Sequence, residues 1–326
     1  MQWKIIAVIV SVIPLIIAAL LLDITFDDLA KIGVMPFILA SIFAIAKLFM
    51  QGLRFHYYLK SFVGNVSSIK KEVEVRMGSE FVTLTTPAYT GGEFIRLAWL
   101  HKNGIHAGKG MWIITIEVIS DVLVGSILSY IAAIYAFLTQ NYLIGLMIII
   151  VVTPILAVYM TLLALSSKKI IQLPKFTSKL LRKIVGEDKS KRWIDNANDA
   201  LKVLCSTSRD NLRHTSLKIF VVGFSLTLLG FLFYASALVV LTNAELGIFE
   251  SLLTVAASIA VGTIPITPGG SGLTEFGMGY YLNVFDLNPA EFGGAIIAWR
   301  IATYHVLLAT SWSLLMHVTM KRKVLK

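Results

Sequence analysis

The chain has 326 residues, of which 56% are hydrophobic and only 15% are charged, and its mean hydropathy is +0.78. A soluble domain carries about 25% charged residues, so this chain lacks the polar side chains that a water-exposed surface would need. The composition therefore excludes soluble, fibrous and disordered proteins and indicates a polytopic membrane protein.

Six apolar runs are long enough to cross a bilayer, which requires about 20 apolar residues per helix. They cover about residues 4–22, 29–50, 109–138, 142–166, 217–242 and 290–320. The alternative for the first run is a signal peptide with Lys4 at its positive end, but its apolar stretch exceeds the roughly 7–15 residues usual for that role.

Positive charge is concentrated in one segment between the fourth and fifth runs. Between Lys168 and Arg213 there are 12 basic and 5 acidic residues, which accounts for seven of the ten net positive charges of the chain. We expect residues 1–326 to form a single transmembrane domain with a basic cytoplasmic segment at 167–215. Anionic lipid headgroups are the expected partners of this segment, and nucleic acid is not, because no binding motif accompanies the charge.

The short loops predict the orientation of the chain in the membrane. Basic residues follow the second, fourth and sixth runs, whereas the loops near 138–142 and 243–247 carry almost none. The basic residues counted after the second run are Arg54, Lys60, Lys70, Lys71 and Arg76. The positive-inside rule then places both termini in the cytoplasm of a multi-pass cell-membrane protein.

Two further segments, at about 73–105 and 248–285, are too apolar for open loops and too interrupted for spans. Each consists of two short helical pieces joined by a tip rich in proline and glycine. Irregular backbone is tolerated at membrane depth only where protein or water satisfies its amides. We therefore predict an all-α polytopic membrane protein with about six transmembrane helices plus two re-entrant helical hairpins.

The two tips resemble each other. Thr86-Pro-Ala-Tyr-Thr-Gly91 and Thr267-Pro-Gly-Gly-Ser-Gly272 share the pattern Thr-Pro-x-x-[Ser/Thr]-Gly, and a glutamate follows each, Glu93 and Glu275. With the orientation above, the first hairpin enters from the cytoplasm and the second from outside. Such an inverted-topology repeat marks a substrate site at the bilayer midplane. Chance is the alternative, because short matches of this kind arise easily in a chain with 23 glycines.

Free amides at the tips, where the second half-helices begin, suit a phosphate or carboxylate, and glycine lets a headgroup approach the backbone closely. The candidate tip residues are Pro87, Gly91, Gly92, Pro268, Gly269, Gly270 and Gly272. The alternative is that these residues only shape the turns.

Charged residues near the tips are further candidates for substrate binding. Glu93 closes a capping box with Thr90 in one interpretation and contributes to the site in the other. Arg96 either pairs with Glu93, holds an anion or extends to the membrane interface. Glu275 has no evident capping partner, and ionisable groups inside a membrane are by default functional.

Glu117 and Asp121 are four residues apart and so share one face of the third span, while Arg300 lies about ten residues into the sixth. An unpaired charge at such depth costs at least ~2.5–3.5 kcal/mol, which predicts an ion pair of Arg300 with Glu117, Asp121 or Glu275. The pair is either structural or exchanges partners with a passing headgroup.

Other ionisable residues are expected to play no part in the site. Lys47 lies close enough to the inner interface to extend to it. His305 and His317 are expected to be satisfied core or interface histidines. The single cysteine, Cys205, excludes an intrachain disulfide and a thiolate cluster.

Four features of the sequence together form a recognisable pattern. They are Thr-Thr-Pro-Ala-Tyr-Thr-Gly-Gly-Glu-Phe-Ile-Arg at 85–96, Glu117 with Asp121, Pro-Ile-Thr-Pro-Gly-Gly-Ser-Gly-Leu-Thr-Glu at 265–275, and Ala-Trp-Arg at 298–300. The chain resembles the lysylphosphatidylglycerol synthase/flippase transmembrane-region family, which includes the UPF0104-like membrane proteins, over nearly its whole length. The resemblance implies a flippase that moves an aminoacylated phospholipid, or a transporter of polyprenyl-phosphate or glycolipid carriers. Since the sequence runs only six residues past the sixth span, we do not expect the aminoacyl-transferase chemistry of fused relatives.

The leading hypothesis is a lipid flippase that moves a phosphate-bearing lipid through a charged midplane cavity between the two hairpins. The alternatives are an ion-coupled transporter of a small anion, an intramembrane lipid-phosphate enzyme and a membrane scaffold. Because no nucleophile elbow, Walker loop or metal-ligand spacing is found, no enzymatic activity, metal or cofactor is expected. The expected partner is a membrane lipid, and a homodimer is left open.

Overall fold

The computed structural model describes residues 30–86, 89–168, 171–173, 186–267 and 269–320, and every regular element within them is helical. Five segments are long and apolar enough to cross a membrane: Val34–Phe62, Ala107–Leu138, Tyr142–Lys168, Leu217–Leu241 and Gly293–Thr319. This confirms the all-α polytopic membrane class. The predicted span at 4–22 lies outside the described residues.

The elements follow one another in a simple order. They are α3 (Val34–Phe62), α4 (Ile69–Leu84), α5 (Gly92–Lys102), α6 (Ala107–Leu138), α7 (Tyr142–Lys168), α9 (Glu187–His214), α10 (Leu217–Leu241), α11 (Ile248–Gly262), α12 (Leu273–Leu282), η1 (Asn283–Phe285), α13 (Gly293–Arg300), η2 (Ile301–Val306) and α14 (Leu307–Met320).

The second predicted span ends too early. We expected it to stop near residue 50, where charged residues begin, but α3 continues to Phe62 and Arg54 lies inside it without any exposed surface. Arg76 is likewise buried, within α4. Both arginines were counted as part of an exposed basic loop, and that interpretation is wrong because buried carboxylates neutralise them.

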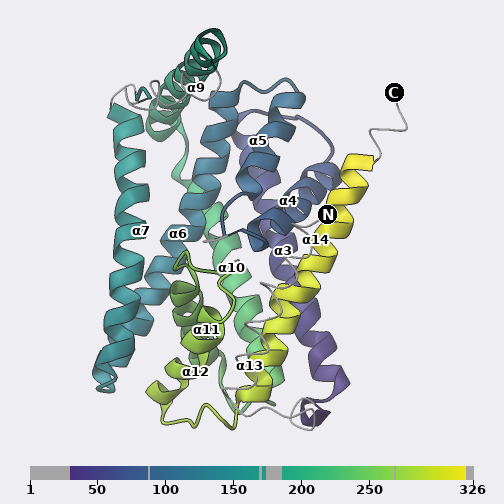
Figure 1. Cartoon of the computed structure of the whole chain (residues 1–326), viewed down its shortest axis with the longest axis vertical. Helices are drawn as coiled ribbons and strands as arrows, with labels where there is room; N and C mark the ends of the chain where they lie inside the picture. The colour runs from purple at the N-terminus through teal and green to yellow at the C-terminus, as the bar shows by residue number, and fades with distance from the viewer. Residues whose placement is uncertain (1–29, 87–88, 169–170, 174–185, 268, 321–326) are drawn as a thin grey trace.

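Two helical hairpins stand where the sequence predicts them. The first consists of α4 and α5, and the second of α11 and α12. Figure 1 shows that α4 and α5 descend from the end of the bundle that carries α9, whereas α11 and α12 rise from the opposite end. The two hairpins therefore point toward each other.

The helix packing relates the two hairpins by an inverted symmetry. Helix α3 runs along α10, α4 packs against α14, and α11 packs against α6. The first helix of each hairpin thus contacts the long helix that follows the other hairpin. Gly78 of α4 makes one of these contacts close, because a Cβ there would lie 2.9 Å from the backbone nitrogen of Leu315.

The tips of the two hairpins touch. The Gly269 N–H donates to the Thr86 carbonyl at 3.3 Å, and the Tyr304 hydroxyl donates to the Leu84 carbonyl at 3.1 Å. The hydroxyls of Tyr89 and Thr274 are 3.3 Å apart. The predicted tip residues Pro87 and Pro268 lie outside the described residues.

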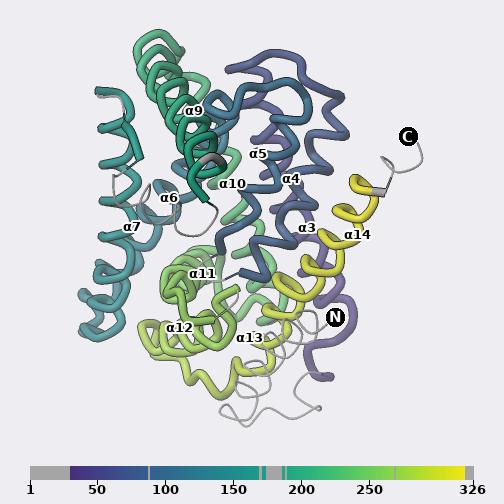
Figure 2. The backbone as a smooth tube through the Cα atoms, turned by 45° about the horizontal axis from the view of Figure 1, so that its top comes forward, coloured from purple at the N-terminus to yellow at the C-terminus, as the bar shows by residue number. Residues whose placement is uncertain are grey.

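The described part of the basic segment forms α9, which lies across the ends of α6 and α7 (Figure 2). Its contacts are close, because a Cβ at Gly108 of α6 would lie 2.8 Å from the backbone nitrogen of Leu204. The Ser166 and Ser208 hydroxyls are 3.0 Å apart and tie α9 to α7. The exposed face of α9 carries Lys191, Arg192 and Trp193.

Candidate functional site

Near the hairpins, the charged side chains of the described residues form two groups, one around the first hairpin and one at the tip of the second. We name the first the α3–α6 ion network; its members are Lys47, Arg54, Arg76, Glu80, Glu93, Arg96, Glu117 and Asp121. The second is the tip ion pair, Arg300 with Glu275.

Glu117 lies at the centre of the α3–α6 ion network and is 1% exposed. Its Oε1 is 2.5 Å from Arg76 Nε and 3.5 Å from Arg54 Nη2, and its Oε2 is 3.2 Å from Arg96 Nε. One carboxylate therefore bridges guanidinium groups from α3, α4 and α5. A buried charge is tolerated only when it is paired. Glu117 is the shared ion-pair partner of these three buried arginines.

The remaining carboxylates complete the neutralisation. Asp121 accepts two hydrogen bonds from Arg54, at 2.6 and 2.8 Å, and Arg54 also donates to the Thr227 hydroxyl of α10. Glu80 is 2.8 Å from Arg76 and 3.8 Å from Lys47. The network holds four cations and four carboxylates, so its formal charge is zero.

The two most exposed members of the network are both carboxylates. The side chain of Asp121 is 38% exposed and that of Glu93 is 30% exposed, whereas Arg54 and Arg96 are at most 2% exposed. A ligand that approaches the network therefore meets acidic groups first.

Both tip glutamates cap the second helix of their hairpin. Glu93 accepts from the Gly91 N–H at 2.7 Å, and Glu275 accepts from the Gly272 N–H at 2.8 Å. The capping role expected for Glu93 is thus present, although the donor is Gly91 rather than Thr90. The expectation that Glu275 lacks a capping partner is wrong. Both glycines have a positive φ, 113° and 87°.

Each capping glutamate also pairs with an arginine. Glu93 Oε1 is 3.3 Å from Arg96 Nη2, within α5. Glu275 Oε1 is 2.9 Å from Arg300 Nε, and this confirms one of the three partners predicted for Arg300. Glu117 and Asp121, the other two candidates, bind arginines of α3, α4 and α5 instead.

Arg300 holds the second tip in place from α13. Its Nη2 donates to the Gly269 carbonyl and, at 3.1 Å, to the Ser271 hydroxyl, and its guanidinium lies 4.3 Å from the centroid of the Tyr304 ring. Gly269 has φ 55°, and a Cβ at this position would lie 2.8 Å from the Leu84 carbonyl oxygen. Only glycine therefore allows the two tips to meet.

The other predicted glycines also lie in tight packing. A Cβ at Gly92 would be 2.8 Å from the Ser79 carbonyl oxygen, and a Cβ at Gly270 would be 2.9 Å from the Tyr89 hydroxyl. Gly92 thus allows close packing within the first hairpin, whereas Gly269 and Gly270 lie at the contact between the hairpins.

Sequence reasoning missed several residues of this region. Lys47 was expected to extend to the interface, but its ammonium lies 4.8 Å from the centroid of the Tyr234 ring, near Glu80. Arg54 and Arg76 were assigned to a loop, and Glu80 was not considered. The spacing of Arg76 and Glu80, four residues apart on one helix, was the available signal.

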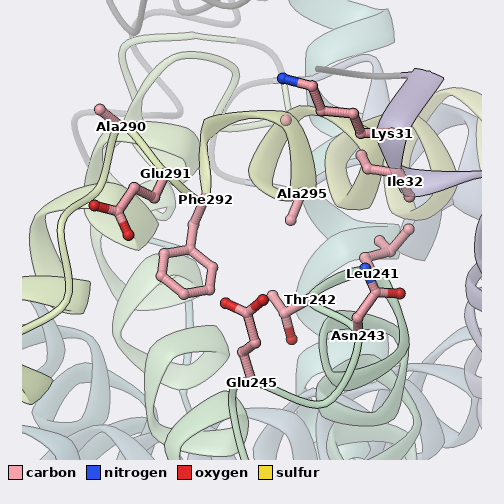
Figure 3. Close-up of a pocket in the computed structure, with 11 residues that line it drawn as sticks. Lys31, Ile32, Leu241, Thr242, Asn243, Glu245, Ala290, Glu291, Phe292 and Ala295 are labelled. Atoms are coloured by element: carbon pink, nitrogen blue, oxygen red, sulfur yellow. The ribbon is translucent and has the colours of Figure 1, made fainter. Parts of the chain in front are cut away.

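One surface hollow, of about 340 Å³, lies away from the tips. It lies at the end of the bundle opposite α9, between the start of α3, the end of α10 and the start of α13. Figure 3 shows the Phe292 ring and the Glu245 carboxylate facing this hollow, with Thr242 beside them. In this conformation the ion pairs and backbone fill the region where the tips meet.

Comparison with known proteins places this arrangement among membrane proteins. A family model described as the lysylphosphatidylglycerol synthase TM region matches residues 4–311. A UPF0104 membrane protein of Archaeoglobus fulgidus is 23% identical over 252 residues, which cover 76% of each chain. The chain is thus similar to proteins whose names describe a membrane location and, for the family, a relation to lysylphosphatidylglycerol.

Proposed function

This chain belongs to the family of lysylphosphatidylglycerol synthase transmembrane regions, and on that premise we propose that it is a flippase that moves a phosphate-bearing lipid between the leaflets of a cell membrane. The observation that carries the proposal is the buried Arg300 guanidinium, which binds the tip of one hairpin where it meets the tip of the other. A guanidinium is the side chain best suited to bind a phosphate with two hydrogen bonds.

The depth of the charged groups supports transport across the bilayer. Helix α6 has 32 residues, and at 1.5 Å per residue Glu117 and Asp121 lie about 15 and 21 Å from its start. The hydrocarbon core is about 30 Å thick, so these groups fall near its middle. We propose that the hairpins are re-entrant and that their tips meet at the midplane.

The exchange of hydrogen-bond partners at Arg300 provides the transport step. Arg300 now donates hydrogen bonds to Gly269 and Ser271 and forms an ion pair with Glu275. A lipid phosphate can take over these contacts without leaving the guanidinium unpaired, so that the tips separate while Glu275 keeps its hydrogen bond from the Gly272 N–H. The headgroup's amine or hydroxyl groups would meet Asp121 and Glu93, and the acyl or prenyl chains would remain in the bilayer.

The orientation belongs to the same proposal. Both termini and α9 face the cytoplasm, where Lys191, Arg192 and Trp193 contact anionic headgroups. Replacing Lys191 and Arg192 by glutamine should reduce the number of phosphatidylglycerol molecules that co-purify with the protein, as measured by native mass spectrometry. The helical content of the protein should not change. Unchanged lipid retention would contradict this contact.

The central test is a scrambling assay in proteoliposomes. Vesicles containing a phosphatidylglycerol with a fluorescent headgroup label are treated with a membrane-impermeant quencher. The fraction of fluorescence that is lost in excess of the outer-leaflet share reports transport. We expect Glu275→Gln and Arg300→Ala to slow transport at least tenfold, and Asp199→Asn, which disrupts the exposed pair with His106, to leave it unchanged. Transport that is insensitive to both tip variants would overturn the proposal.

The proposal is transport without covalent change, and this separates it from the alternatives. The lipid recovered from the vesicles should have an unchanged mass, whereas release of inorganic phosphate would indicate an enzyme. Uptake of a radiolabelled soluble anion without lipid movement would indicate a carrier of small anions.

A further inference from the structure

His305 is a half-buried titratable group that the charged clusters do not use. Both of its ring nitrogens are shielded from solvent, and neither has a hydrogen-bond partner among the described residues. We expected a satisfied histidine at this position, and the structure meets that expectation only in part, because the nearby Arg300 carbonyl does not complete a hydrogen bond of good geometry. A buried polar group without a partner calls for a functional explanation, and histidines within membrane spans serve as proton-carrying groups.

The backbone brings His305 close to the tip ion pair. In an α-helix, positions 300 and 305 would lie about 140° apart around the axis. Ile301–Val306 is instead a π-helix, whose i→i+5 repeat brings position 305 to nearly the same side as Arg300. Such single-turn π segments occur frequently at functional sites. The charges of Arg300 and Glu275 both act on the imidazole, and the Arg300 backbone carbonyl lies near it.

The other elements around the π-helix add no competing charge at this position. Helices α3, α13 and α14 pack against it. The nearest cation that α3 contributes to this region, Lys47, is engaged by Glu80. The titratable residue of Leu307–Met320 is His317, which lies about three turns farther along the helix and is exposed. Tyr304, beside His305, places its ring 5.0 Å from the imidazole.

We propose that His305 is a proton-binding site coupled to phosphate binding at Arg300, so that a proton and a lipid phosphate bind together. The positive charge of Arg300 opposes protonation of His305. A phosphate that binds Arg300 adds negative charge beside the imidazole and therefore favours the imidazolium, and by reciprocity the proton favours phosphate binding by the same factor. This inference rests on the phosphate binding at Arg300 that the proposed function includes, but not on lipid movement across the membrane.

The first test measures proton binding directly. In protein labelled with ¹⁵N-histidine and held in neutral detergent, the resonance that is missing in His305→Gln identifies His305 among six histidines. We expect dioleoylphosphatidylglycerol to raise its titration midpoint by about one pH unit, equivalent to about a tenfold coupling, and diacylglycerol to leave it unchanged. A midpoint that does not respond to the phosphate lipid, or a resonance that does not titrate, overturns the inference.

The second test measures the transport consequence in the scrambling assay. Wild-type protein should transport about tenfold faster at pH 6 than at pH 8, His305→Gln should show no such pH dependence, and the control His317→Gln should keep it. Retention of the wild-type pH profile in His305→Gln overturns the inference. If no variant scrambles lipid, the proposed function fails, and the titration in detergent still decides the role of His305.

Discussion

Replacing Glu117 by glutamine tests whether the α3–α6 ion network is a single neutralised unit. The carboxylate contacts Arg54, Arg76 and Arg96 at 2.5–3.5 Å and is 1% exposed. The amide keeps the shape of the side chain but removes its charge, so the network passes from neutral to a net charge of +1 inside the bundle.

Breaking a buried ion pair by neutralising one partner costs about 3–5 kcal/mol, because an uncompensated charge remains. A change of this size should lower the thermal midpoint by roughly 10 °C. The matched control is Asp121→Asn, one turn farther along α6. Its neutralisation changes the charge of the network by the same amount, but its carboxylate is 38% exposed and accepts two hydrogen bonds from one guanidinium, so the expected loss is smaller, about 1.5–3 kcal/mol, that of hydrogen bonds to a charged group.

The assay is thermal unfolding in detergent micelles, monitored by tryptophan fluorescence. The double variant Glu117→Gln with Arg76→Gln restores the neutral charge of the network. Its loss in the free energy of unfolding should be about 1–3 kcal/mol smaller than the sum of the losses of the two single variants. The reasoning is refuted if Glu117→Gln costs no more than Asp121→Asn, or if the two substitutions in the double variant are simply additive.

Two further substitutions test the contact between the hairpin tips. Gly269→Ala should abolish lipid scrambling, because its Cβ would meet the Leu84 carbonyl at 2.8 Å. The control Gly64→Ala, also at positive φ but with nothing within 4 Å, should lower the free energy of unfolding only by the backbone strain of about 1–2 kcal/mol. Equal effects of the two substitutions on scrambling and on thermal unfolding would contradict this. Tyr304→Phe removes a hydrogen bond from η2 to Leu84 at the end of α4, beside the tips, and Tyr281→Phe removes one to Ala132 elsewhere. Each substitution should lower the free energy of unfolding by about 1 kcal/mol, but only Tyr304→Phe should change the scrambling rate. An equal change of the scrambling rate in Tyr281→Phe would count against a role for the tips.

The hairpins were predictable because their signals are local. Proline and glycine interrupt helices within a few residues, and two similar interruptions at corresponding places in the chain indicate a repeat. The glutamates after the tips were predictable for the same reason. The cap formed by Glu275 was missed because its helix begins at Gly272, which has no side chain to complete the usual capping pattern.

The partners of the buried arginines were not predictable because pairing depends on tertiary structure. Arg54 and Asp121 are 67 residues apart in sequence, and Arg76 and Glu117 are 41 apart. The positive-inside rule assigned both arginines to a loop because it counts charge without knowing which charges are neutralised by buried carboxylates. The π-helix after Arg300 has no local sequence signal at all.

The most direct test of the account is the position of a bound lipid in a structure of the protein in a phosphatidylglycerol nanodisc. We predict density for the headgroup phosphate beside Arg300, between residues 86–92 and 267–272, at the middle of the bilayer. Tips that lie in water, or lipid phosphates that lie only around the outer surface of the bundle, would contradict the account.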